Sequence, residues 1–245
     1  MPFKPVILWT DALVFLLVFI VLITIWYVRN NEHLLAPWRR VGHSTSGMSA
    51  LTVLLVFIAI GFLDTLHFRP ALEHTNSQGE RVYSVEVLSV LDIVLTPLRT
   101  NVEKTYSAPL ATHLYTKETV DLPDGSQKRT FARLEFGGAH LQDPDTEHLQ
   151  DIGWRAITGA CLGLLVWCGL HALLCLLMAR RSKNNFVQCF QAIWRRTTEI
   201  PWHAILITLA FIFILIGAIA MLAVHYHVLG TDKVGQDVTA DNTPV

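Results

Sequence analysis

Four stretches of the chain contain no Lys, Arg, Asp or Glu: residues 12–28, 41–63, 156–179 and 202–224. Each is long enough to cross the roughly 30 Å hydrocarbon core of a bilayer as a helix, which takes about 17 to 25 residues. These stretches hold much of the apolar content of 52%, while charged residues make up only 16% of the 245 residues. Soluble domains carry about 25% charged residues. The sequence therefore predicts a polytopic membrane protein that is mainly α-helical.

The Lys and Arg residues of the short loops predict how the spans are oriented, because cations accumulate on the cytosolic side. Residues 64–155 are left out of this count, since long segments cross the membrane largely regardless of charge. Ten cations remain, and eight lie in two loops: Arg29, Arg39 and Arg40 in one, and Arg180, Arg181, Lys183, Arg195 and Arg196 in the other. We expect Arg39 and Arg195 in the cytosol, Thr105 and Gly125 outside, and both termini extracytoplasmic.

The predicted organisation has four parts. Residues 1–68 hold two transmembrane helices and a short cytosolic loop, and residues 69–155 form an extracytoplasmic domain. Residues 156–201 hold the third transmembrane helix and a basic cytosolic loop, and residues 202–245 hold the fourth transmembrane helix and an outer-face tail. The first span is interpreted as an uncleaved anchor with Thr10 or Asp11 as its N-cap.

The polar segment between the second and third spans shows both helix and strand signals. Apolar residues at helical spacing over 84–96 predict a helix that stops at Pro97. Residues 118–131 contain Pro-Asp-Gly at 123–125 between two β-prone arms, which predicts a hairpin. The expected fold class is therefore a membrane protein with four transmembrane helices and one mixed α/β extracytoplasmic domain between the second and third.

Two patterns stand out in the third span. Cys168, His171 and Cys175 share one helix face, as the ligands of a metal ion would. The outer two lie roughly 10 Å apart along the helix, which is too far for one ion, so a packing seam is the favoured interpretation. Gly159 and Gly163 form a small-xxx-small spacing that would let another helix approach closely.

The remaining polar residues give no pattern typical of a catalytic site. Residues 143–147 begin like a calcium loop but lack the required Gly and Glu at loop positions 6 and 12, so an acidic turn is favoured. The polar segment has neither a nucleophile elbow nor a zinc-protease pattern around its candidate residues: Ser84, Ser89, Ser107, His113, His140 and His148. We expect no catalytic residues, no metal and no cofactor. The net charge of -1 argues against nucleic acid as a partner.

The chain after the fourth span reads Gly-Thr-Asp-Lys-Val-Gly-Gln-Asp-Val over residues 230–238. The two glycines permit tight turns, Thr231 or Asp232 could cap a short helix, and Asp237 could accept a hydrogen bond. The stretch resembles the L-G-T-D-x-x-G-R/Q-D-V signature of the permease subunits of peptide-type ABC importers, the oligopeptide, dipeptide and nickel group. The residues that match are Gly230, Thr231, Asp232, Gly235, Gln236, Asp237 and Val238.

Other segments agree with this resemblance. Residues 190–196 resemble the cytosolic segment that leads into the same span in the family. Residues 103–110 and 136–141 resemble parts of the N-terminal extension that some members carry. The resemblance implies the N-terminal portion of a permease in the bacterial inner membrane, acting as a scaffold for the transport of peptides or similar small solutes without chemistry of its own.

The same resemblance implies the partners of the chain. They are membrane lipid, a second permease subunit, cytosolic ATPase subunits and an extracytoplasmic solute-binding protein. Family permeases continue with further spans and a cytosolic loop that docks on the ATPase, whereas this sequence ends at residue 245. A truncated permease is therefore expected, and its substrate-binding residues are unknown. The alternative is a membrane-anchored extracytoplasmic module for binding, sensing or assembly, in which the spans display residues 69–153.

Overall fold

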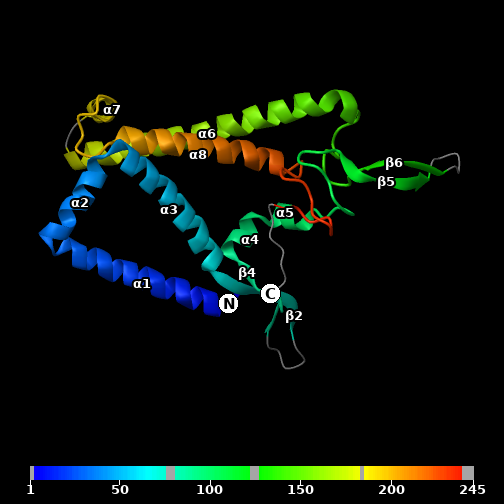
Figure 1. Cartoon of the computed structure of the whole chain (residues 1–245), viewed down its shortest axis with the longest axis horizontal. Coiled ribbons are helices and arrows are strands. Elements are labelled where there is room, and N and C mark those ends of the chain that lie inside the picture. The colour runs from blue at the N-terminus through cyan, green and yellow to red at the C-terminus, as the bar shows by residue number, and fades with distance from the viewer. Residues whose placement is uncertain (1–2, 76–80, 122–126, 183–184, 239–245) are drawn as a thin grey trace. The chain divides into compact units, whose positions relative to one another are not determined.

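The computed structural model describes residues 3–75, 81–121, 127–182 and 185–238, which are mainly helical (Figure 1). The chain divides into two compact units. Unit 1 comprises Met1–Val94 and Cys175–Leu209, and unit 2 comprises Leu95–Leu174 and Ala210–Val245. The segment 69–155, expected as one domain, thus contributes residues to both units.

In the described part of the chain, four helices are long and apolar enough to cross a membrane: α1 (Trp9–Arg29), α3 (Thr45–Thr65), α6 (Pro144–Ser182) and α8 (Trp202–Ala223). Each of them overlaps one of the four predicted apolar stretches. Their large apolar side chains are mostly exposed; Leu17 on α1 and Phe57 on α3, for example, are 60% and 68% exposed. Surfaces of this kind are covered by lipid rather than by water, so the chain is a membrane protein with four candidate spans.

The first two spans begin at other residues than the sequence suggests. The N-cap of α1 is Leu8, not Thr10 or Asp11. Asp11 lies within the first turn, where its carboxylate accepts the Leu8 N–H at 2.9 Å. The second apolar stretch is interrupted, because α2 (Glu32–His43) runs into it and Ser44 then caps α3 by accepting the Gly47 N–H at 3.3 Å. A serine at this position satisfies a free N–H of the new helix and so sets its start.

Helix α6 begins well before the apolar stretch, at residues that were interpreted as an acidic turn. Asp143 accepts hydrogen bonds from the Thr146 hydroxyl and the Asp145 N–H, at 2.8 and 3.3 Å. The Glu147 carboxylate accepts the N–H groups of Gln142 and Asp143. Carboxylates in the first turn also interact favourably with the positive end of the helix dipole. Residues 143–147 are therefore the capped start of a helix.

A small antiparallel sheet in unit 1 joins the start of α1 to the end of α3 (Figure 1). Strand β2 (His67–Thr75) pairs with β1 (Phe3–Pro5), β3 (Arg81–Tyr83) and β4 (Leu88–Ser89). The register places Lys4 opposite Arg69 and Pro5 opposite Phe68. Unit 1 also contains α7 (Phe186–Trp194), which buries Cys189 and Ile193 one turn apart.

The predicted helix over residues 84–96 is wrong in its extent. The chain forms β4, then α4 (Val90–Val94), and a further short helix, α5 (Thr96–Thr100). Ser89 and Asp92 accept each other's backbone N–H, at 3.0 and 2.8 Å, which forms a capping box that starts α4. Pro97 lies in the first turn of α5, where a proline costs no hydrogen bond, so it does not end the helix.

The predicted hairpin in unit 2 is confirmed. Strands β5 (His113–Asp121) and β6 (Gln127–Arg133) pair antiparallel, with Lys117 opposite Phe131 and Thr119 opposite Arg129. The turn residues 123–125 lie outside the described residues. Buried apolar residues of unit 2 include Leu114 in β5, Leu134 directly after β6, Leu141 and Tyr226.

The small-xxx-small spacing of the third span is used within unit 2, where α6 packs against α8 (Figure 1). A Cβ added at Gly159 would lie 2.3 Å from the carbonyl oxygen of Gly217. One added at Gly163 would lie 2.1 Å from the carbonyl oxygen of Phe213. The two helices can approach this closely only because these positions carry no side chain.

Replacing Gly163 by leucine is expected to force α6 and α8 apart and to lower stability by about 1–3 kcal/mol, the usual cost of overpacking. Thermal unfolding of the detergent-solubilised chain measures the effect. Gly169→Leu is the matched control, because a Cβ at Gly169 on the same helix meets nothing within 4 Å. Equal unfolding temperatures for the two variants would contradict the close packing.

Candidate functional site

Three segments that are distant in the sequence meet in unit 2: residues 103–110, 136–141 and 225–238. We call this meeting point the junction. The Glu103 N–H donates to the carbonyl of Gly235 at 2.7 Å, and the Leu110 N–H donates to that of His227 at 2.9 Å. The Gly138 N–H donates to the carbonyl of His225 at 2.9 Å. Backbone hydrogen bonds therefore join the very segments that carry the family resemblance.

Residues 230–238 form a loop that closes on itself. The Asp232 carboxylate accepts the N–H groups of Val234 and Gln236, at 3.0 and 2.9 Å, and the Val238 N–H donates to the Gly230 carbonyl at 3.1 Å. The prediction that Thr231 or Asp232 caps a short helix is wrong. Asp232 instead stabilises a turn, because a short carboxylate can reach the N–H groups two and four residues onward.

The two glycines of this loop meet conformational and steric requirements that other residues do not. Their φ angles are +82° at Gly230 and +80° at Gly235, in the left-handed region that glycine adopts without strain. A Cβ at Gly235 would lie 1.7 Å from the Glu103 carbonyl oxygen, and one at Gly230 would lie 2.4 Å from that of Ser107. Both positions therefore exclude a side chain.

The other matched residues hold the loop against residues 103–107. The buried Thr231 hydroxyl donates to the Thr105 carbonyl at 2.8 Å and lies 3.1 Å from the Ser107 hydroxyl. Gln236 contributes through its backbone carbonyl, which accepts the Asp232 N–H at 2.8 Å. Asp237 is 2% exposed and points at His227. All six predicted motif residues thus lie within the junction.

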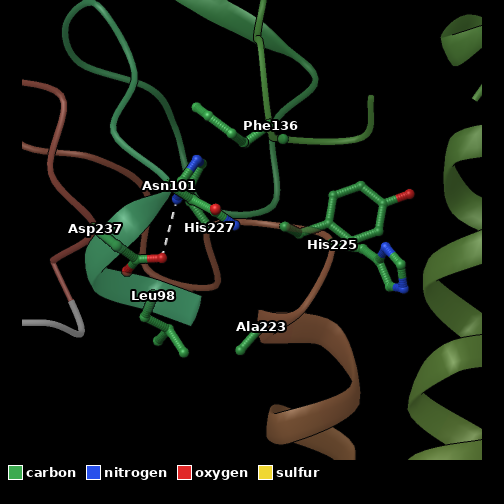
Figure 2. Close-up of a pocket in the computed structure, with 9 residues that line it drawn as sticks. Leu98, Asn101, Phe136, Ala223, His225, His227 and Asp237 are labelled. Atoms are coloured by element: carbon green, nitrogen blue, oxygen red, sulfur yellow. Dashed lines mark hydrogen bonds and ion pairs between the residues drawn. The ribbon is translucent and has the colours of Figure 1, made fainter. Parts of the chain in front are cut away.

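A buried group of three ionisable side chains forms the centre of the junction. Figure 2 shows His227 facing Asp237, with Nδ1 3.0 Å from the carboxylate. The Nε2 atom of His227 lies 3.3 Å from the Glu103 carboxylate. That carboxylate also accepts three backbone N–H groups, from Glu135, Phe136 and Gly137, at 2.8, 2.8 and 3.0 Å.

These contacts keep Glu103 and His227 ionised despite their burial. Burial alone would raise the pKa of Glu103, but hydrogen bonds from His227 and the three backbone N–H groups lower that pKa to about 2. Burial alone would lower the pKa of His227, but its hydrogen bonds to Asp237 and Glu103 raise that pKa to about 9. At neutral pH, His227 is therefore a cation held between two carboxylates.

The stability of unit 2 is expected to be greatest between about pH 4.5 and pH 6.5. The contribution of His227, whose pKa is raised, is complete below its unfolded value of 6.5 and is lost as the pH rises through about 9. The contribution of Glu103, whose pKa is lowered, is complete above its unfolded value of 4.5 and is lost as the pH falls toward 2. Thermal unfolding at a series of pH values tests this, and His227→Gln should flatten the alkaline side. An unchanged alkaline side in that variant would contradict the assignment.

A second polar group ties α6 to the junction. The Tyr226 hydroxyl donates to Asp151 at 2.7 Å, and the same carboxylate oxygen lies 2.7 Å from both Arg155 Nε and His140 Nε2. Burial and the hydrogen bond to Asp151 raise the pKa of Tyr226, so its hydroxyl stays protonated. Tyr226 thus connects the end of the fourth span to the first turns of α6.

The junction is a packed structural element rather than a ligand pocket. The depression drawn in Figure 2, which Leu98, Asn101 and Phe136 help to line, is too small to hold a water molecule. His227 and Asp237, which line it, are engaged with each other, and His227 is also engaged with Glu103. The arrangement can fix the chain segments in place, and it leaves no free group of this cluster for a bound substrate.

The candidate catalytic and metal-binding residues are not assembled into a site. Ser89 bonds the Asp92 backbone, Ser107 contacts Thr231 and Ser84 accepts the Glu86 N–H. Within the described residues, none of these serines hydrogen-bonds to a histidine. Along α6, Cys168 is exposed while His171 and Cys175 are buried. No group of three or more possible metal ligands was found in the described part of the chain.

Sequence reasoning missed the roles of Glu103, His227, Tyr226 and Asp151. Glu103 and His227 are 124 residues apart, and a single sequence gives no signal for a contact over that distance. The only local signal was the His-Tyr-His triplet at 225–227, directly after an uncharged span. Polar rings at this position need partners once they are buried, which marks them as candidates for a structural network.

Comparison with protein-family models, with curated proteins and with solved structures finds no match to this chain. The resemblance of residues 230–238 to a permease signature therefore stays a prediction from the sequence. The structure adds the physical role of each matched residue within the junction.

Proposed function

We propose that this chain is the N-terminal portion of the permease subunit of a bacterial inner-membrane ABC importer for peptides or similar small solutes. The observation that carries the proposal is the geometry of residues 230–237. Five of the six matched residues at 230–237 are of a type that meets a physical requirement of one closed loop, while Gln236 contributes through its backbone. Gly230 and Gly235 provide positive φ and close approach, Thr231 and Asp237 make buried hydrogen bonds, and Asp232 stabilises the turn.

The role proposed for the chain is that of a scaffold. Residues 103–110 and 136–141 resemble the N-terminal extension of some family members. Glu103 contacts the loop directly through its N–H bond to the Gly235 carbonyl, and residues 136–141 contact Glu103 and, through the Gly138 N–H, the carbonyl of His225 just before the loop. The junction would thereby brace the outer end of the fourth span, where the translocation core of such a permease begins. Proposed partners are a second permease subunit and ATPase subunits on the cytosolic side. A solute-binding protein would dock on the outer side.

Affinity purification of the tagged full chain from bacterial membranes tests this proposal. The expected result is recovery of a second permease and an ATPase subunit in fixed proportion. Gly235→Ala should weaken this recovery because it disrupts the junction, whereas Gly153→Ala should leave it intact because a Cβ there meets nothing within 4 Å. Recovery of a stoichiometric partner unrelated to transport would instead support a membrane-anchored binding or assembly module.

The orientation of the chain is a separate part of the proposal. Single cysteines at the exposed Lys104 and Arg39, in a background without the four native cysteines, allow labelling by a membrane-impermeant reagent. The cation bias of the short loops predicts labelling of position 104 from the outside and of position 39 only after the membrane is opened. The opposite pattern would overturn the proposed topology and place the junction in the cytosol.

A further inference from the structure

Helix α2 divides its residues between an apolar and a polar face. Successive residues of a helix are turned by about 100°, and on this basis the large apolar residues of α2 occupy about a third of its circumference: Leu34, Leu35, Trp38 and Val41. The opposite side carries the charged residues and histidines: Glu32, His33, Arg39, Arg40 and His43. A helix divided in this way lies at a boundary between an apolar phase and water.

Unit 1 covers the apolar face of α2 only in part. Leu34 and Leu35 are partly buried, whereas the charged residues and histidines of α2 are all exposed, so the apolar face turns toward the rest of the unit. Trp38 and Val41 on the same face nevertheless remain 64% and 44% exposed, and α2 contains no buried residue. The apolar face therefore has room for a further apolar contact.

Helix α2 lies across the ends of two candidate membrane spans. It begins at Glu32, three residues after α1 ends, and it is followed directly by Ser44, the N-cap of α3. Figure 1 shows α1 and α3 converging at the sheet, with α2 crossing between their other ends. A helix that joins the ends of two spans in this way lies along the surface of the bilayer. The lipid around α1 and α3 thus continues onto α2.

Cations without a carboxylate partner border the apolar face. Arg39 follows Leu35 by four residues, so it lies about 40° beyond the edge of that face, whereas Arg40 lies on the far side of the helix. Both arginines are exposed, and neither pairs with a carboxylate of the described residues.

A contact at the end of α2 adds further positive charge. The His43 Nδ1–H donates to the Glu199 carbonyl at 2.7 Å. This hydrogen bond joins α2 to the segment that carries two more exposed arginines at residues 195–196. Clustered cations beside an exposed apolar face complement a leaflet that contains anionic lipid, whose surface potential is negative.

We propose that α2 is an interfacial helix that binds a leaflet containing anionic phospholipid. Trp38 and Val41 contact the upper part of the acyl chains. Arg39 binds a lipid phosphate, with its methylene groups along the apolar face, and Arg40 faces water. The occupant is a lipid leaflet rather than an acidic protein surface, because two candidate spans hold α2 at the bilayer and its exposed apolar side chains need an apolar phase.

Spin labels test the contact between α2 and lipid. Single cysteines replace Ala36 on the polar face or Val41 on the apolar face, in a full chain without the four native cysteines. The labelled chain is reconstituted in vesicles of dioleoyl phosphatidylcholine and dioleoyl phosphatidylglycerol. We expect the label at position 41 to collide with oxygen, which concentrates in lipid, and the label at position 36 with a nickel chelate, which stays in water. Equal access of the chelate to both labels would overturn the proposal.

A comparison of two lipids with the same acyl chains tests the role of charge. The detergent-solubilised full chain is incubated with dioleoyl phosphatidylglycerol or dioleoyl phosphatidylcholine, and bound lipid is counted by native mass spectrometry. We expect tighter binding of phosphatidylglycerol. Arg39→Gln should weaken that binding by about fivefold, as the loss of one cation near an anionic leaflet predicts, and should leave phosphatidylcholine unaffected.

Arg40→Gln is the matched control, because it removes the same charge from the opposite side of the same helix. Its effect on phosphatidylglycerol binding should be clearly smaller than that of Arg39→Gln. Equal binding of the two lipids by the unaltered chain would overturn the proposal, and so would equal effects of the two substitutions. Both arginines are exposed, so both variants should fold, which thermal unfolding checks. The spin-label experiment keeps both arginines and decides independently of these variants.

Discussion

Replacing Gly235 by alanine is expected to destabilise unit 2 by at least about 3 kcal/mol, because the new Cβ combines backbone strain with a clash. Alanine is strained at a φ of +80°, and its Cβ would lie 1.7 Å from the Glu103 carbonyl oxygen. The loop would have to leave residues 103–107 to relieve the overlap. Trypsin provides a local measurement, since the exposed Lys104 and Lys233 lie beside the two contacting segments. Faster cleavage at both lysines is the expected result.

Gly153→Ala is the matched control for this experiment. Gly153 lies in α6, where an added Cβ meets nothing within 4 Å. Alanine is favoured over glycine in helices by up to about 1 kcal/mol, so this variant should be as stable as the original or slightly more so. Equal cleavage rates at Lys104 in the two variants would show that the loop does not pack on Glu103.

Replacing Glu103 by alanine is expected to cost about 3–5 kcal/mol, the usual effect of removing one partner from a buried ion pair. The substitution leaves the cationic His227 with only Asp237 and leaves three backbone N–H groups without their acceptor. Glu103→Gln keeps one oxygen as an acceptor but removes the charge, so it should fall between alanine and the original. Thermal unfolding near pH 6, where both groups contribute fully, measures the series.

Glu135→Gln is the control for the Glu103 series. Glu135 is exposed and donates only its backbone N–H to the cluster, so the loss of its charge should change stability little. A Glu103→Ala variant that unfolds at the same temperature as Glu135→Gln would mean that the buried cluster contributes nothing to stability.

The buried cluster also suggests why the junction fixes one arrangement of its segments. A carboxylate that accepts three consecutive N–H groups fits only one conformation of residues 135–137. His227 uses both ring nitrogens, so its ring orientation is fixed as well. Displacing any one of the three segments would expose a buried charge without its partner, and this penalty favours a single arrangement.

The sequence by itself determined the features that depend on neighbouring residues. Runs without charge located the four candidate spans, because transfer of a helix into lipid depends on its own side chains. Two β-prone arms around Pro-Asp-Gly located the β5–β6 hairpin, and the glycines identified the close approach on α6 and the turns at Gly230 and Gly235.

The structure decided where several elements begin, through local caps, and its tertiary packing alone decided which distant groups became partners. Caps at Ser44 and Asp143 make α3 and α6 begin at other residues than the apolar stretches predicted. The Ser89–Asp92 capping box starts α4 within the segment that was predicted as one longer helix. The pairing of Glu103 with His227, and of Asp151 with Tyr226, brings together residues that local preferences do not relate. The long-range pairs form because buried charges and backbone groups must find partners wherever packing places them, and that requirement acts through space rather than along the chain.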